Sequence, residues 1–309
     1  MRAVWSFWSA PYRAHYHRFW HSEKHHLLSW VLSLGEASRH YPDTWLFTDD
    51  WGARMLVDSL ELPFRHVDLR LDGLCGASCD NEWWVLGKLT AYAAQTTPFL
   101  HLDNDVYLWN PLPATVTAAP VFVQNPEVFY FEDQSLYRLE PFLRGIERFG
   151  GWLPPEWLWY AERRGNRALC CGILGGHDLD FIRHYASRAI EVIRHPGNQP
   201  VWPTLGVRDN ILVEQYFLAA CLEYHRQNRR SPPSELEAAY LFPSSADAFD
   251  PECATRVGYT HLIGDAKNNR SIADSLERRV QSDYPDYYER CLAYLDRHSI
   301  PSEAGSGMW

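Results

Sequence analysis

Apolar runs alternate with amphipathic segments through the first third of the chain. Short runs rich in apolar residues predict strands, and they lie at 2–7, 44–48, 64–69 and 98–100. Segments in which apolar residues recur every three or four positions predict helices, and they lie at 24–40, 51–60 and 83–94. Strands that alternate with helices predict a parallel α/β sheet of Rossmann type. Ligands of such sheets bind beyond the carboxyl ends of the strands.

The rest of the chain has a less regular pattern. Further strands are predicted at 121–124, 168–176 and 257–262. Further helices are predicted at 179–195, 209–224 and 274–298. We expect a loop rich in histidine and aromatic residues after the first strand. We also expect an irregular excursion, rich in aromatic residues, proline and arginine, at 126–165.

Composition narrows the class of protein. The 309 residues carry a formal net charge of −10 and include 14 Trp and 17 Tyr. This charge argues against broad nucleic-acid binding, which needs a basic surface. No apolar stretch approaches the ~18 residues of a membrane span, and the Trp-rich start lacks the apolar region of a signal peptide. Seven cysteines, among which Cys75 and Cys79 lack a matching zinc-binding pair, favour reduced thiols in a cytoplasmic protein.

The strand at 98–100 leads into the most informative motif, HLDNDVYLW at 101–109. Asp103 and Asp105 flank Asn104, and they share one side of the strand if the strand continues through them. Two carboxylates at the end of a buried strand suit Mg²⁺ or Mn²⁺ that also holds substrate phosphates. The alternative is an acidic turn that closes the strand.

A second motif, YTHLIGDAKNN, lies at 259–269. His261 offers a nitrogen ligand to a metal held by the aspartate pair. Gly264 permits close approach of backbone to a phosphate, and Lys267 offers a point charge to a diphosphate. The alternative for His261 is a structural histidine in a turn.

Together these motifs resemble those of the GT-A nucleotide-sugar glycosyltransferases, in particular glycosyltransferase family 8, the glycogenin-like enzymes. That family has a lysine-bearing helix before its Asp-x-Asp strand, matched here by Lys88. It has an apolar strand with a polar–Gly turn, matched by 170–172, and a helix that begins with an acid–amide pair, matched by Asp209-Asn210. It closes with His-x-x-Gly-x-x-Lys, matched by the motif at 259–269. We expect a bacterial branch of this fold.

The chain also departs from the family. The Pro-Trp that usually follows the last lysine is Asn268-Asn269 here, and the Asn before the glycine turn is a cysteine. The resemblance implies a single GT-A domain at 1–270, with a nucleotide-binding half (1–113) and an acceptor half (114–270). A C-terminal helix at 271–300 and a disordered tail at 301–309 follow.

The resemblance also implies a division of roles. Asp103, Asp105 and His261 would hold Mn²⁺ or Mg²⁺ on the diphosphate of a nucleotide-sugar, with Gly264 and Lys267 on the same leaving group. Lys88 would reach the donor sugar or a phosphate; its alternative is a solvated helix lysine. The nucleoside-facing positions are expected to be Ser6, Phe7, Trp8, Asp49 and Asp50. The two aspartates are alternatively helix caps, an assignment favoured for Asp50.

Acceptor and stereochemistry are less constrained. Trp152, Trp157 and Trp159 are expected to stack on the acceptor or to form a lid. An inverting enzyme needs a carboxylate base, for which Asp209 and Glu214 are the candidates, whereas the resemblance favours retention. By resemblance the donor is a UDP-sugar; a peptide, a saccharide or a small natural product would be the acceptor.

Two other functions compete with this hypothesis. Nucleotidyltransferases usually carry a glycine-rich basic loop after the first strand, but here that place holds SFWSAPYRAHYHRFW. A non-catalytic carbohydrate-binding protein would explain the tryptophan excess, yet it has no need of a metal pair and a phosphate-facing lysine.

Overall fold

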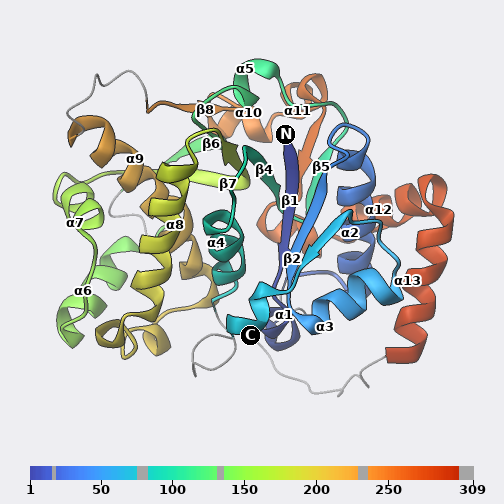
Figure 1. Cartoon of the computed structure of the whole chain (residues 1–309), viewed down its shortest axis with the longest axis horizontal. Coiled ribbons are helices and arrows are strands. Elements are labelled where there is room, and N and C mark those ends of the chain that lie inside the picture. Colours follow the sequence, from blue (N-terminus) through green and yellow to red (C-terminus); the bar gives the residue numbers. More distant parts are fainter. Residues whose placement is uncertain (16–18, 75–82, 131–135, 229–235, 299–309) are drawn as a thin grey trace.

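The computed structural model describes residues 1–15, 19–74, 83–130, 136–228 and 236–298. A seven-stranded sheet in the order β3-β2-β1-β4-β7-β6-β8 forms its centre, and β5 and β9 form a separate pair (Figure 1). The strands are β1 (Arg2–Phe7), β2 (Thr44–Thr48), β3 (His66–Asp68), β4 (Phe99–Leu102), β5 (Val106–Leu108), β6 (Val121–Val128), β7 (Arg167–Gly176), β8 (Ala238–Tyr240) and β9 (Tyr259–His261). The predictions for Cys75, Cys79 and the tail at 301–309 lie outside the described residues.

Strand direction confirms the mostly parallel sheet that the sequence predicts. β1 is parallel to both β2 and β4, β2 is parallel to β3, and β6 is parallel to β8. Only β7 is reversed among the described strands of this sheet, because it is antiparallel to both β4 and β6. The result is a mixed α/β sheet compatible with a Rossmann-like fold.

Helices cover both faces of the sheet. The α-helices are α1 (Ser9–His15), α2 (Glu23–Ser38), α3 (Asp50–Ala53), α4 (Val85–Ala93), α5 (Ala114–Thr117), α6 (Leu139–Phe149), α7 (Pro155–Glu162), α8 (Leu179–Arg194), α9 (Phe217–Asn228), α10 (Ser245–Phe249), α11 (Pro251–Val257), α12 (Arg270–Asp283) and α13 (Pro285–His298). Two segments are π-helical: Arg54–Ser59 directly follows α3, and Leu212–Tyr216 directly precedes α9.

Alternation along β1 separates two apolar cores. Val4 packs into the core beneath α4, α8 and α9, whereas Ala3 and Trp5 pack into the core beneath α2, α12 and α13. Figure 1 shows these helix groups on opposite sides of the strands. Burial of both faces explains why the central strands are continuous apolar runs.

The structure corrects four local predictions. The expected loop after β1 is helix α1, and the expected irregular excursion at 126–165 contains the end of β6 and the helices α6 and α7. The expected single C-terminal helix is two helices, broken at Tyr284-Pro285, because a residue before proline is disfavoured in the α-conformation. Both helices pack on α2 and join its core.

The fourth correction concerns helix capping. Asp49, not Asp50, is the N-cap of α3: its Oδ1 accepts from the Gly52 amide at 2.8 Å. Asp50 is exposed and pairs with Arg54 at 2.5 Å.

None of the helices in the described part of the chain is both long and apolar enough to cross a membrane.

Candidate metal and phosphate site

The aspartate pair lies in a turn and not in a strand. β4 ends at Leu102 and β5 begins at Val106. The turn closes with a hydrogen bond from the Val106 amide to the Asp103 carbonyl at 3.0 Å, and the Asp103 amide donates to the Gly172 carbonyl on β7 at 3.0 Å. The strand therefore does not continue through both aspartates, the alternative of an acidic turn that closes the strand is confirmed, and this turn brings the two carboxylates together. The backbone of Asn104 is held from α2, because its carbonyl accepts from Ser29 Oγ at 2.8 Å.

Pairing of β5 with β9 brings the second motif to the first. His261 lies opposite Val106 in the antiparallel register, and the Leu262 amide donates to the Asp105 carbonyl at 3.0 Å. His261 Nε2 lies 3.5 Å from Asp105 Oδ1. One ligand atom from each of Asp103, Asp105 and His261 lies within 4.8 Å of the others. The three predicted metal ligands thus meet, although His261 lies 156 residues after Asp105 in the sequence (261 − 105).

Gln124 on β6 orients the His261 ring. Its Oε1 lies 2.7 Å from His261 Nδ1 and accepts from the Tyr259 hydroxyl at 2.6 Å. Because that oxygen accepts, Nδ1 carries the proton and Nε2 presents its lone pair toward the aspartates. A Cβ at Gly172 would collide with both Gln124 and the His261 ring, so glycine is required there. Gly172 lies within strand β7, so the turn that was expected at 170–172 is wrong.

Lys267 also contacts Asp105, with Nζ in direct ion-pair contact with Oδ2. It lies on the 3₁₀ segment Gly264–Asn268, which Gly264 starts in the left-handed region at φ 55°. Burial raises the pKa of Asp105, but the adjacent Lys267 ammonium outweighs burial and holds that pKa below its usual range. Asp105 is therefore an anion despite its burial.

A second ion cluster adjoins the first. Lys88 Nζ lies 2.9 Å from Asp103 Oδ1 and 2.6 Å from Glu214 Oε1. Lys88 is 6% exposed, so the alternative of a solvated helix lysine is wrong. Burial opposes its charge, but Asp103 and Glu214 hold the pKa of Lys88 above its ordinary value. Burial raises the pKa of Asp103, Lys88 lowers it and Asp105 raises it again.

The donor set fits a hard divalent cation. Three carboxylates (Asp103, Asp105, Glu214) face two ammonium groups (Lys88, Lys267) in this connected cluster, so the ionised groups sum to −1 with His261 neutral. Carboxylate oxygens with one imidazole suit Mn²⁺ or Mg²⁺. A cation there would also offset the burial of Asp103.

A comparison with protein families matches residues 1–294 to a family of unknown function, DUF6734. The chain belongs to this family. A comparison with curated proteins found no match. The DUF6734 match spans the whole site, from the first strand to Lys267 and beyond.

The nucleoside-facing predictions have mixed outcomes in this DUF6734 chain. Phe7 and Trp8 are both buried in the cores, and half-buried Ser6 lies with Oγ 2.9 Å from His101 Nε2. Asp49 Oδ2 accepts from the amide and hydroxyl of Ser9 at 2.9 and 2.7 Å. Its oxygens are thus already bonded within the protein.

The predicted base candidates are both buried. Glu214 is 0% exposed and pairs with Lys88. Asp209 is 1% exposed, and its Oδ2 accepts from the Gly206 amide at 2.7 Å. Neighbouring Asn210 accepts from the Val85 amide at 3.3 Å and ties this segment to the start of α4.

The predicted acceptor tryptophans separate into different environments. Trp157 is fully buried and stacks between Phe142 and Phe217, which contradicts a stacking role toward an acceptor. Trp159 borders a cleft of about 350 Å³, and the Arg163 guanidinium lies 4.2 Å from its ring centre. Trp152 stacks on His195.

A separate cleft of about 530 Å³ is bordered by His261 itself.

Sequence reasoning missed Gln124 and Tyr259, which hold His261. No local pattern marks Gln124, because its role depends on β6 lying beside the tip of β9. Tyr259 stands two residues before His261 on the same strand, and period-2 alternation is the one signal that places both on one face.

Proposed function

We propose that this protein is a metal-dependent glycosyltransferase of the GT-A fold, which transfers a sugar from a nucleotide-sugar. The observation that carries the proposal is the convergence of Asp103, Asp105 and His261, with Lys267 in contact with the same carboxylate. The site lies at the carboxyl end of a strand that is parallel to its neighbour β1, where ligands of such sheets bind. A divalent cation with a lysine beside it suits a diphosphate.

In this proposal Asp103, Asp105 and His261 hold Mn²⁺ or Mg²⁺. When bound, the metal neutralises charge on the departing nucleoside diphosphate. Lys267 pairs with Asp105 without donor and turns its ammonium to the diphosphate when donor binds. Gly264 has a positive φ and no side chain, so the backbone at the start of the segment Gly264–Asn268 can approach a phosphate closely. These preorganised charges stabilise the leaving group as its bond to the sugar breaks.

Lys88 has a positioning role in this proposal. It is held from Glu214 on one side and contacts Asp103 on the other, so it fixes the carboxylate of Asp103. Glu214 in turn serves as the counter-ion of Lys88 and not as a base.

Retention of configuration is the stereochemical outcome that we favour. Both candidate bases are buried and already bonded, Glu214 to Lys88 and Asp209 to the Gly206 amide. Because burial keeps both of these carboxylates away from an acceptor hydroxyl, we assign the acceptor proton to the leaving phosphate oxygen. The bond from the anomeric carbon to that phosphate breaks, and a bond to the acceptor oxygen forms on the same face.

Donor and acceptor are proposed from the family resemblance and from composition. A UDP-sugar is proposed from family resemblance alone, and the acceptor remains a peptide, a saccharide or a small natural product. A cytoplasmic location is consistent with the free thiols at Cys170, Cys171, Cys221, Cys253 and Cys291.

The experiment that tests this function is a donor screen by mass spectrometry, in which nucleotide-sugars are incubated with the protein and no acceptor. The proposal predicts slow hydrolysis of one nucleotide-sugar that requires Mn²⁺ or Mg²⁺ and is lost in Asp103→Asn. Absence of turnover together with absence of nucleoside diphosphate binding would refute it. Binding of free sugars without nucleotide would instead favour a carbohydrate-binding protein.

A further inference from the structure

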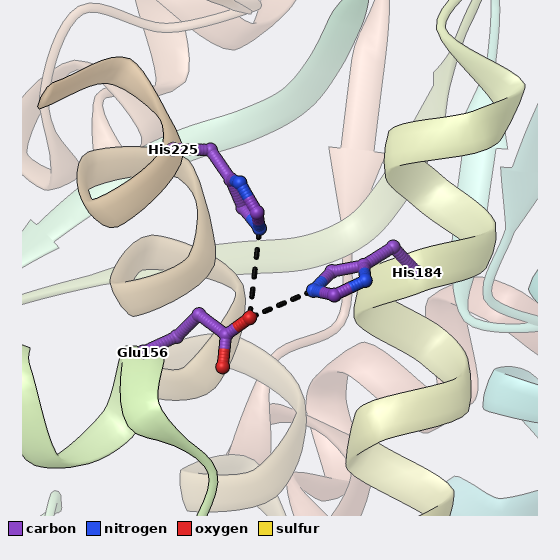
Figure 2. A group of neighbouring side chains, drawn as sticks. All are labelled: Glu156, His184 and His225. Atoms are coloured by element: carbon purple, nitrogen blue, oxygen red, sulfur yellow. Dashed lines mark hydrogen bonds and ion pairs between the residues drawn. The ribbon is translucent and has the colours of Figure 1, made fainter. Parts of the chain in front are cut away.

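Three side chains from three helices converge on the other side of the sheet from α2. Glu156 lies in the first turn of α7, His184 in the middle of α8 and His225 near the end of α9. Figure 2 shows both imidazoles directed at the same carboxylate oxygen. His184 Nε2 lies 2.8 Å from Glu156 Oε1, and His225 Nε2 lies 3.6 Å from it.

We propose that Glu156, His184 and His225 form a second metal site, which binds Zn²⁺. The site is separate from the aspartate pair and does not depend on the proposed glycosyl transfer. None of its residues belongs to a motif of the sequence.

The spacing of the ligand atoms supports this assignment. One ligand atom from each residue lies within 4.8 Å of the others. Zn²⁺ with bonds of about 2.0–2.1 Å holds tetrahedral ligand atoms roughly 3.3 Å apart. The two carboxylate–imidazole distances, 2.8 and 3.6 Å, bracket that value. Small side-chain rotations would thus suffice to coordinate the ion.

Unsatisfied atoms point the same way. Glu156 is 5% exposed, yet its Oε2 has no hydrogen-bond partner, and buried His225 Nε2 has none either. A buried carboxylate and a buried imidazole nitrogen normally find partners. Within the described residues the ion pairs of Glu156 are with these two histidines, and no lysine or arginine approaches it as a salt bridge. A divalent cation would satisfy the carboxylate and both rings at once.

The alternative is a carboxylate that accepts a hydrogen bond from each imidazole. That arrangement accounts for the 2.8 Å contact to His184. It leaves His225 at 3.6 Å, beyond a normal hydrogen bond, and Oε2 without a partner.

Ligand chemistry selects the ion. Two imidazoles with one carboxylate suit Zn²⁺ and similar transition metals, whereas Mg²⁺ and Ca²⁺ prefer oxygen ligands. The His184 side chain is 35% exposed, so solvent can supply a fourth ligand. Bound Zn²⁺ would cross-link α7, α8 and α9 and stabilise the part of the fold that carries Trp159.

The test is Zn²⁺ titration of the full-length, tag-free, EDTA-treated protein by calorimetry, with thermal unfolding measured in parallel. The proposal predicts that His184→Gln and His225→Gln each lose one Zn²⁺ equivalent, or bind it at least tenfold more weakly, and lose the Zn²⁺-induced rise in Tm. His66→Gln is the matched control, because His66 faces a single carboxylate, Asp43, at 3.5 Å. His66→Gln should bind as many Zn²⁺ equivalents as the wild type. Asp105→Asn should keep the equivalent bound by Glu156, His184 and His225, whatever it loses at the aspartate site.

A second measurement needs no variant. Diethylpyrocarbonate modification, located by mass spectrometry, should spare His184 and His225 when Zn²⁺ is present and not when Mg²⁺ replaces it. Unchanged Zn²⁺ binding in both glutamine variants, absence of Zn²⁺ binding by the wild type, or modification that Zn²⁺ does not slow would each overturn the proposal. Since nucleotide is absent from both measurements, their failure is distinguishable from failure of the proposed function.

Discussion

Lys88 Nζ lies 2.6 Å from Glu214 Oε1, and both side chains are buried. The pair joins α4 to the π-helical segment before α9, and Tyr92 on α4 also donates to Glu214 at 3.3 Å. It is continuous with the candidate metal site, because Lys88 contacts Asp103 as well. The charge of Lys88 is therefore shared between its counter-ion Glu214 and a candidate metal ligand, Asp103.

Lys88→Met should therefore destabilise the protein strongly. It leaves Asp103 and Glu214 facing each other without a counter-charge, and breaking a buried pair in this way costs about 3–5 kcal/mol. The measurement is the free energy of unfolding in urea with EDTA present. Lys24→Met is the matched control, because Lys24 pairs with Glu277 near the surface and such pairs contribute about 0–1 kcal/mol. Equal losses in the two variants would contradict the cluster as described.

The pH dependence of stability should carry a contribution from His26. Burial, reinforced by Lys267 and opposed by Asp105, lowers the pKa of His26 from 6.5 to about 3. Between these values the unfolded chain binds one proton more than the folded protein, so the stability contributed by neutral His26 is present above pH 6.5 and lost as pH falls. From pH 7 to pH 5 the loss is about 2 kcal/mol.

His26→Gln tests this contribution, since glutamine keeps an acceptor for the Trp30 indole N–H, which donates to His26 Nε2 at 3.2 Å. Urea unfolding at the two pH values should show a decrease that is smaller by about 2 kcal/mol in the variant. The same decrease in both proteins would mean that His26 is not held neutral.

The part of the fold built from buried apolar runs was predictable. β1 and β2 were predicted with their observed bounds, because strands covered on both faces are mostly apolar. Helix α1 was missed because SAPYRAH has no apolar period, and its first turn is held by Asp49, 40 residues away. The break at Pro285 was readable from the sequence, since proline favours the first turn of a helix.

The candidate site was predictable only as far as its motifs. Asp103, Asp105 and His261 were identified from residue type and spacing, and the structure brings them together. The residues that hold these ligands in place were not identified, because Gln124 lies on β6 and contacts His261 on β9, 137 residues away in sequence. Glu156 and its two histidines have no shared motif either, and they meet only through the packing of three helices.

Gln124→Leu should weaken metal-dependent nucleotide binding about 10–100-fold, because a ligating histidine depends on the acceptor at its other nitrogen. Gln124 Oε1 accepts at His261 Nδ1, 2.7 Å away, and the leucine removes that acceptor. Calorimetry with UDP and Mn²⁺ measures the effect. Gln124→Glu keeps an oxygen at this place and should retain binding; a leucine variant with wild-type affinity would show that Gln124 does not orient the ring.

Hydrogen exchange of the segment Gly264–Asn268 should slow when UDP and Mn²⁺ bind. None of its residues is buried, and the Lys267 side chain is in contact with Asp105. A segment with so little apolar burial opens readily, and phosphate contacts would hold it closed. Exchange that is equally fast with and without the ligand would place the diphosphate elsewhere.

The most direct test of the central claim is calorimetric titration of UDP into the wild type and Asp105→Asn, with Mn²⁺ and with EDTA. The account predicts Mn²⁺-dependent binding by the wild type, and binding weaker by more than about 100-fold in the variant, since a direct ligand matters more than its supports. Asp43→Asn, at a partly exposed aspartate that pairs with Arg2, should bind as the wild type does. Mn²⁺-dependent affinity that is unchanged in a folded Asp105→Asn protein would contradict the site.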